Sequence, residues 1–485
     1  MTFLNDLRTL ILLKTPVIAI ETTEEERFLS ILEQMLRQWP LFTWSASRGL
    51  VIEGKAIDGT EDPLAAMNHI REQKAPLALV MYDVDPYLSD RNPAFLRAVK
   101  EFSMMRRGKD SFLFLVSSYL SLPEVLKRDV QSLILPPPDA SFLRKKLEPF
   151  LNEIQLPSDP DLLDHGAALL QGLTEREVDF ALSHARRTLT KVTPGDLLDV
   201  LMMEKITLVR AGGVVEPIPV KAGVAQIGGL DNLKEWLRMR ERFIRSYLRG
   251  ESTIMPRGLL LMGISGCGKS LSVKAIADIW KLPLFKLDMN LVFSERHGNA
   301  ERVFHEALRF MESVAPAVLW LDEIEMGISA QADTSTSARV FAHFLTWMQE
   351  RKELVFVAAT ANRIDLLPAE LIRRGRFDQV FFVDLPSDEE RKEIFQVHLL
   401  RRGLDIAKFD FITLSQATKN FSGAEVEQCV VSALAASIAE GREMTQDDLY
   451  WEIHHIIPLA TTMDDQIKSI RSWARKRAVN ASRGS

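Results

Sequence analysis

The residues with the clearest chemical meaning form a glycine-rich octapeptide, Gly-Ile-Ser-Gly-Cys-Gly-Lys-Ser. Gly263, Gly266 and Gly268 permit positive φ angles and a close approach of the backbone, so successive N–H groups can converge on phosphate oxygens. We expect Lys269 to reach the β- and γ-phosphates of a nucleoside triphosphate and the Ser270 hydroxyl to ligate Mg²⁺. The predicted phosphate-binding residues are Gly263, Ile264, Ser265, Gly266, Cys267, Gly268, Lys269, Ser270 and Leu271.

Two adjacent carboxylates follow an apolar run that ends at Leu321. Asp322 and Glu323 are expected at the carboxyl end of a buried strand, which is where ligands bind in parallel sheets. We expect Asp322 to orient Mg²⁺ and its waters, and Glu323 to act as general base on the attacking water. Asn362, at the end of the next apolar run, is expected to hold that water. A turn residue without a catalytic role is the alternative for Asn362.

Three arginines follow in the segment Leu-Ile-Arg-Arg-Gly-Arg-Phe-Asp, which spans residues 371–378. Arginines at this place are not expected to face a phosphate on their own chain. In a ring they would reach the site of a neighbouring subunit, where a planar guanidinium neutralises transition-state charge. Surface salt bridges are the alternative.

The elements that must position these residues alternate between strand and helix. Thr23 and Glu26 predict a capping box at the start of one helix. Residues 387–460 carry no strand pattern and predict a helical subdomain. Because short apolar runs alternate with helices, we predict an α/β fold with a parallel sheet covered on both faces. The predicted buried strands are 16–20, 77–82, 112–116, 258–262, 317–321 and 354–359.

Several motifs of the first half recur in the second half at separations of 239 to 249 residues, which match Asp83 with Asp322 and Asp139 with Asp388. We interpret this as a duplication, each half being a sheet domain with a helical lid. The alternative is two unrelated α/β domains with similar strand composition. The expected parts are a degenerate α/β domain (1–138), its helical lid (139–210), a linker rich in glycine and proline (211–225), a working α/β domain (226–386), a second lid (387–460) and a basic C-terminal helix and tail (461–485).

The first half lacks the residues of a phosphate loop. After its first predicted strand, the segment from Glu21 to Glu26 holds four glutamates and neither glycine nor lysine, and such a segment repels a triphosphate. Val84 stands opposite Glu323 in the matched repeat. We therefore expect the first half to bind a partner or to stabilise a ring.

Composition restricts the remaining choices. The net charge of -6 disfavours a nucleic-acid partner, because phosphate contacts need a basic surface. Two cysteines, Cys267 and Cys429, predict a reducing compartment, the cytoplasm or a plastid stroma. Cys267 could favour a thiolate at a helix start, although a tolerated small residue is the simpler reading. The tail after Gln466 is basic, with Ile467 and Trp473 at helical spacing; it could contact a membrane peripherally or pack on protein.

Together these motifs resemble the AAA family of AAA+ ATPases, from Ile227 to Leu459, in the segments GISGCGKS, WLDEIE, ATANRIDLLPAELIRRGRFD, PSDEERKEIFQVH and FSGAEVEQ. The chain is similar to the AAA-domain proteins of cyanobacteria and algal chloroplast genomes, which have a degenerate N-terminal half. The resemblance implies ATP and Mg²⁺ as ligands, a hexamer, and Arg373 with Arg376 as paired arginine fingers. It also implies that Ile227, Gly228 and His398 border the adenine, and that Gly423 and Ala424 lie where the lid meets the nucleotide.

One departure from the family concerns the first pore loop. Ring translocases of this family carry an aromatic residue there, whereas this chain has Arg296 and His297. Threading of an unfolded polypeptide is therefore less expected. The function expected is coupling of ATP hydrolysis to remodelling of a protein client; the alternative is an ATP-controlled regulatory or assembly scaffold with slow hydrolysis.

Overall fold

The fold is described from a computed structural model, which covers residues 3–37, 39–89, 91–118, 120, 122–188, 193–209, 214–220, 227–294, 299–325, 334–363, 366–367, 369–373 and 375–483. The chain forms two compact units. The first is Met1–Asp139 with Thr174–Val178, and the second is Ala140–Leu173 with Asp179–Ser485. Among the residues covered, no helix combines the length and the apolar character needed to cross a membrane.

The first unit contains a sheet of seven strands in the order β4-β3-β2-β5-β6-β1-β7. The strands from β2 to β7 in this order are parallel to one another, and the β3 and β4 strands are antiparallel additions at one edge. The strands are β1 (Val17–Glu21), β2 (Leu41–Ser45), β3 (Gly49–Ile52), β4 (Lys55–Ile57), β5 (Leu77–Tyr82), β6 (Ser111–Ser117) and β7 (Gln131–Ile134).

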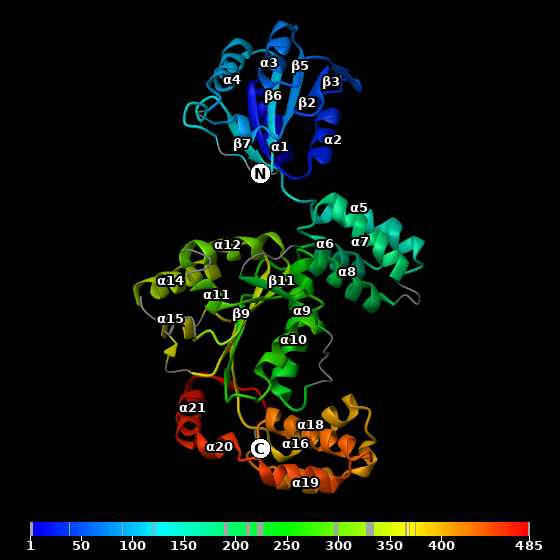
Figure 1. Ribbon diagram of the computed structural model, residues 1–485, viewed down its shortest axis with the longest axis vertical. Helices are drawn as coiled ribbons and strands as arrows, with labels where there is room; N and C mark the ends of the chain where they lie inside the picture. The colour runs from blue at the N-terminus through cyan, green and yellow to red at the C-terminus, as the bar shows by residue number, and fades with distance from the viewer. Residues whose placement is uncertain are drawn as a thin grey trace. The chain divides into compact units, whose positions relative to one another are not determined.

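Helices cover both faces of this sheet (Figure 1). Successive side chains of a strand point to opposite faces, so Ile18 and Ile20 pack with α1 (Phe3–Leu12) and α2 (Glu25–Met35). Val17 and Ala19 instead pack with α3 (Pro63–Glu72) and α4 (Pro93–Arg106). The continuous apolar runs are thus explained by burial on both faces.

The second unit contains a second sheet, in the order β14-β13-β9-β12-β11-β10-β8. One face packs with α9 (Asp231–Leu248) and α10 (Lys269–Trp280), and the other with α12 (Ala300–Ser313) and α14 (Thr334–Glu350). The strands are β8 (Val215–Ile218), β9 (Gly258–Gly263), β10 (Leu284–Leu287), β11 (Ala317–Leu321), β12 (Val355–Ala361), β13 (Gln379–Val383) and β14 (Val479–Asn480). Short helices α11 (Met289–Val292) and α15 (Ala369–Ile372) lie between them in the chain.

The two sheets share one topology. In each, five parallel strands have the order second, third, fourth, first, fifth along the chain: β2-β5-β6-β1-β7 and β10-β11-β12-β9-β13. In the second sheet, β14 is a further parallel strand beside β13. This agreement supports the predicted duplication. The matched pair of aspartates is wrong by one residue, however. Asp83 and Glu323 are the residues with positive φ, 52° and 47°, directly after a partly buried residue, so Asp83 corresponds to Glu323 rather than to Asp322.

Helices form the remaining subdomains, and the α/β fold with helical lids is confirmed. The helices after the first sheet are α5 (Ala140–Glu153), α6 (Pro160–Leu170), α7 (Glu175–Thr188) and α8 (Pro194–Leu208). The helices after the second sheet are α16 (Asp388–Arg401), α17 (Phe411–Ala417), α18 (Gly423–Ala439), α19 (Gln446–His455), α20 (Leu459–Thr462) and α21 (Asp464–Arg477).

Three local expectations need correction. The helix cap at Thr23 is absent, because α2 begins after Glu24, whose backbone N–H is held by the Thr22 hydroxyl. The expected linker 211–225 contributes β8, an antiparallel edge strand beside β10, where Pro217 is tolerated. The C-terminal helix α21 does not present its apolar residues to a membrane, because Ile467 is buried and Ile470 and Trp473 pack against the second sheet's core.

Candidate nucleotide site

The glycine-rich loop connects β9 to α10. Its three glycines have positive φ angles of 149°, 76° and 93° at Gly263, Gly266 and Gly268. A Cβ on Gly263 would lie 2.0 Å from the carbonyl oxygen of Val383, and a Cβ on Gly266 would lie 3.0 Å from the Cβ of Ala424. The loop therefore needs glycine for conformation and for space, and it leads directly into the N-terminus of α10, which favours an anion.

Lys269 is the first residue of α10 and is buried. Its ammonium donates to the carbonyl oxygens of Gly263 and Ile264 at 3.0 and 2.7 Å. Burial lowers the pKa of Lys269 to about 8, while nearby Glu323 and Asp322 act in the opposite direction. At neutral pH most of the ammonium thus stays charged, directly beneath the loop.

The carboxyl ends of β11 and β12 carry a hydrogen-bonded network. Asp322 Oδ1 accepts from the Thr360 hydroxyl at 2.7 Å and lies 3.5 Å from Ser270 Oγ. The same Thr360 oxygen accepts from the Glu323 backbone N–H at 3.0 Å. Asn362 Nδ2 donates to Glu323 Oε1 at 2.8 Å. The structure thus brings together residues predicted from three separate segments.

Glu325 is a residue of this network that the sequence analysis missed. Its side chain is buried, and Oε1 accepts from the backbone N–H groups of Asn362 and Arg363 at 2.7 and 3.2 Å. Burial raises the pKa of Glu325 despite these two donors. The carboxyl group of Glu325 therefore fixes the backbone that carries the Asn362 amide. A second acid two residues after Glu323 is the sequence signal that could have identified it.

The lid closes the other side of the site. The backbone N–H of Ala424 donates to the Gly266 carbonyl at 2.9 Å, which joins α18 to the phosphate loop. A Cβ on Gly228 would meet the Ile394 backbone N at 3.0 Å, so α16 packs closely against this segment. Burial lowers the pKa of His398 below its usual value, and the nearby Glu427 carboxylate offsets only part of this shift.

These elements enclose a cleft with a volume of about 320 Å³. Its size, its glycine cradle, its buried lysine and the facing Ser270 and Asp322 oxygens fit a nucleoside triphosphate with Mg²⁺. Gly263 and Ile264 lie beneath the cleft as partners of Lys269. The predicted residues that line it are Ile227, Gly228, Ser265, Gly266, Cys267, Gly268, Lys269, Ser270, Leu271, Asp322, Glu323, Asn362, His398, Gly423 and Ala424. Lining residues that were not predicted are Leu230, Thr360, Ile394, Val397, Arg401 and Glu427.

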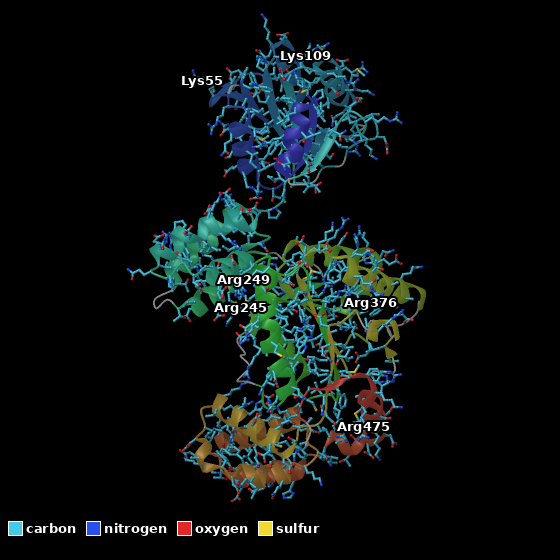
Figure 2. The ribbon with its side chains drawn as sticks, turned by 180° about the vertical axis from the view of Figure 1, so that it is seen from behind. Lys55, Lys109, Arg245, Arg249, Arg376 and Arg475 are labelled. Atoms are coloured by element: carbon cyan, nitrogen blue, oxygen red, sulfur yellow. The ribbon has the colours of Figure 1, made fainter. Side chains whose placement is uncertain are left out.

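The remaining predicted residues do not line the cleft. Arg373 is exposed. Arg376, which is labelled in Figure 2, donates to the Leu345 carbonyl at 2.8 Å. Arg296 and His297 lie outside the described residues. Of the two readings of Cys267, a tolerated small residue fits the structure better than a thiolate, because burial raises the pKa of this thiol to about 12.

The corresponding place in the first unit has different chemistry. Three residues, Thr22 to Glu24, separate β1 from α2. The Glu24 carboxylate pairs with Arg27 and accepts from the Glu175 backbone N–H at 2.6 Å. Where the second unit has a glycine cradle and a lysine, the first unit has a half-buried carboxylate, which disfavours a phosphate.

This fold and this cleft define the class: a P-loop ATPase of the AAA+ type, which hydrolyses ATP with Mg²⁺. The profile of the ATPase family associated with various cellular activities (AAA) matches residues 259–385, and that of the SpoVK-like AAA ATPase N-terminal domain matches residues 3–135. The AAA domain-containing protein ycf46 of Pyropia yezoensis is 32% identical over 500 residues, covering 99% of this chain and 100% of the relative. That of Trieres chinensis is 33% identical over 487 residues, covering 98% and 97%. The chain belongs to the AAA ATPase family that includes these plastid-type proteins.

More distant relatives match a smaller part of this chain. The proteasome-activating nucleotidase of Saccharolobus solfataricus is 27% identical over 368 residues, covering 70% of this chain and 91% of the relative. The cell division cycle protein 48 homologue of Archaeoglobus fulgidus is 28% identical over 332 residues, covering 62% and 45%.

Proposed function

We propose that this ATPase works as an oligomeric ring, most simply a hexamer, that uses ATP hydrolysis to remodel a protein client. The observation that carries the proposal is the arrangement of one cleft and two arginines. The cleft holds the loop lysine and both acids, whereas Arg373 and Arg376 do not line it. A guanidinium from a neighbouring subunit would complete such a site.

Within the cleft, each residue has a role that its contacts support. Lys269 holds the terminal phosphates, while Ser270 and Asp322 serve Mg²⁺, which neutralises phosphate charge when bound. Glu323 accepts a proton from the attacking water, and the Asn362 amide, 2.8 Å from Glu323 Oε1, keeps that carboxylate and the water in place. Ile227, Gly228 and His398 contact the base, and Gly423 with Ala424 couple the lid to the phosphate loop.

Movement of the lid against the sheet would transmit hydrolysis to a client. The hydrogen bond from the Ala424 N–H to the Gly266 carbonyl ties α18 to the loop that holds the phosphates. Any change at the loop therefore acts on the lid. One relative is named a proteasome-activating nucleotidase, and a proteasome is a protein assembly, which supports a protein client rather than a nucleic acid.

A regulatory or assembly scaffold with slow hydrolysis is the second candidate. It is favoured by the pore-loop sequence, which has Arg296 and His297 instead of aromatic residues, and by the carboxylate at Glu24 in the first unit.

Both cysteines are free and buried, which supports a reducing compartment such as the cytoplasm or a plastid stroma.

Steady-state turnover of purified protein tests the proposal. We expect Mg²⁺-dependent ATP hydrolysis, and a loss of at least about a hundredfold in kcat for Glu323→Gln with ATP binding retained. Affinity capture with Glu323→Gln in ATP should then retain the client for mass spectrometry. Hydrolysis by Glu323→Gln at the parent rate would refute the assignment of the base. Slow turnover that no captured protein stimulates, together with ATP-dependent assembly, would favour the scaffold.

A further inference from the structure

A lysine without a role in the proposed chemistry lies beside the carboxylate expected to serve the metal ion. Lys286 is on β10, opposite Trp320 on β11 and opposite Glu216 on β8 in the sheet register. Its ammonium lies 2.9 Å from Asp322 Oδ2 and 4.7 Å from the centroid of the Trp320 ring. The ion pair and the cation–π contact together hold the ammonium in one place.

Both oxygens of the Asp322 carboxylate therefore have protein partners. Oδ2 accepts from Lys286, while Oδ1 accepts from the Thr360 hydroxyl at 2.7 Å and lies 3.5 Å from Ser270 Oγ. With each oxygen held from its own side, the carboxylate cannot rotate without breaking one of these contacts. Oδ1 is thus the oxygen directed toward Ser270 and the cleft, and Lys286 maintains that orientation by binding the other oxygen, Oδ2.

The same ammonium is a fixed positive charge close to the place where a divalent cation would bind. The Lys286 side chain is 30% exposed and that of Asp322 is 23% exposed, so water and salt screen this charge incompletely. Like charges a few ångströms apart repel measurably even near a protein surface. A triphosphate adds negative charge that offsets the repulsion, so Mg²⁺ is accepted with the nucleotide rather than alone.

We propose that Lys286 is a positioning residue of the nucleotide site whose positive charge opposes Mg²⁺ more than its hold on Asp322 favours the ion, so that its net effect is to raise the Mg²⁺ concentration needed for tight nucleotide binding. This inference rests on the proposed function, in which Asp322 serves the metal ion. It assigns to β10 a part in setting the Mg²⁺ requirement, through a side chain that does not line the cleft.

A Mg²⁺ titration of nucleotide binding tests this role. Full-length protein carrying Glu323→Gln binds a fluorescent ATP analogue without turnover, and the Mg²⁺ concentration at half-saturation is measured. Lys286→Met and Lys286→Gln both remove the charge, and each should lower that concentration by at least about threefold. Lys274→Met is the matched control, because the Lys274 ammonium lies 6.0 Å from the same Trp320 ring on another element; it should leave the value unchanged.

The outcomes separate the two proposals. An unchanged or higher half-saturation concentration in both neutral variants, with unfolding temperatures like that of the parent, overturns the role of Lys286 and leaves the proposed function intact. A parent protein that binds the analogue without any dependence on Mg²⁺ also overturns the role of Lys286, while the proposed function is then decided by Mg²⁺-dependent turnover.

Discussion

At the scale of single residues, one hydroxyl group serves both acids of the site. Thr360 Oγ1 donates to Asp322 Oδ1 and accepts from the Glu323 backbone N–H. The hydroxyl thereby fixes the metal-site carboxylate relative to the general base, although it need not touch the nucleotide's reacting atoms. Outer partners of this kind are worth roughly 10- to 100-fold in metal affinity or activity.

Replacing this hydroxyl should slow the chemical step. Thr360→Val keeps the shape of the side chain, and we expect kcat to fall by about tenfold while the affinity for ATP changes by less than about threefold. Thr360→Ser restores the hydroxyl and should retain most of the activity. Steady-state kinetics with a separate binding measurement distinguish the two effects; a Val variant with the parent kcat would show that Thr360 has no such role.

A second residue-scale prediction concerns Lys205 on α8, which is fully buried with its ammonium 3.5 Å from the Ala315 carbonyl. Burial lowers the pKa of Lys205 to about 7, against about 10.5 in an unfolded chain. The cost of charging it is complete below pH 7 and disappears as pH rises toward 10.5, because the unfolded chain then binds more protons than the native state.

Lys205→Met should therefore raise the free energy of unfolding, by on the order of 2–4 kcal/mol at pH 7. The advantage over the parent should shrink between pH 7 and pH 10. Urea denaturation at several pH values measures both effects. Lys145→Met, at an exposed position on α5, should change stability by less than about 0.5 kcal/mol. A Lys205→Met variant that is less stable than the parent would show that the ammonium is better compensated than its surroundings indicate.

At the scale of elements, functional residues that are neighbours in the sequence could be predicted, whereas residues that only the sheet brings together could not. The predicted ranges 77–82 and 317–321 coincide with β5 and β11, because strands buried on both faces read as continuous apolar runs. The glycine-rich loop carries its whole function in neighbouring residues. Thr360 is found only through the register of β11 and β12, which no local pattern encodes, whereas Glu325 has a local signal as the second acid after Glu323. Short strands such as β8, in a segment rich in glycine and proline, resemble loops.

The short strand β14 is anchored by the burial and the hydrogen bonds of the residue that follows it. Ala481, directly after β14, is fully buried; its N–H donates to the Phe382 carbonyl at 2.8 Å and its carbonyl accepts from Leu233 at 3.1 Å. Ala481→Asp would bury a charge there, so we expect a loss of about 3 kcal/mol or more in stability. Val479→Asp, at a 46% exposed position, should cost less than about 1 kcal/mol. Thermal unfolding compares the two variants. Equal losses of stability would mean that the segment around Ala481 is not packed into the core.

At the scale of the whole molecule, two sheets of the same topology carry different residues at matching places. The second sheet keeps the phosphate loop and both acids, whereas the first has the Glu24 carboxylate at the matching place. Since the nucleotide cleft of the second unit carries the chemistry in the part of the chain that the structure describes, cooperation in the proposed ring would come from contacts between chains. The proposed arginine fingers make this dependence testable, because they would act on a site other than that of their own chain.

Subunit mixing tests that dependence. Lys269→Ala removes phosphate binding but leaves Arg373 available, and Arg373→Ala leaves the cleft complete but removes the exposed guanidinium. Each variant alone should be nearly inactive. In an equal mixture, about a quarter of the interfaces pair an intact cleft with an intact arginine, so up to about a quarter of the parent activity should return. If mixed assemblies form, as judged by co-purification of differently tagged chains, and activity stays absent, Arg373 does not act across the interface.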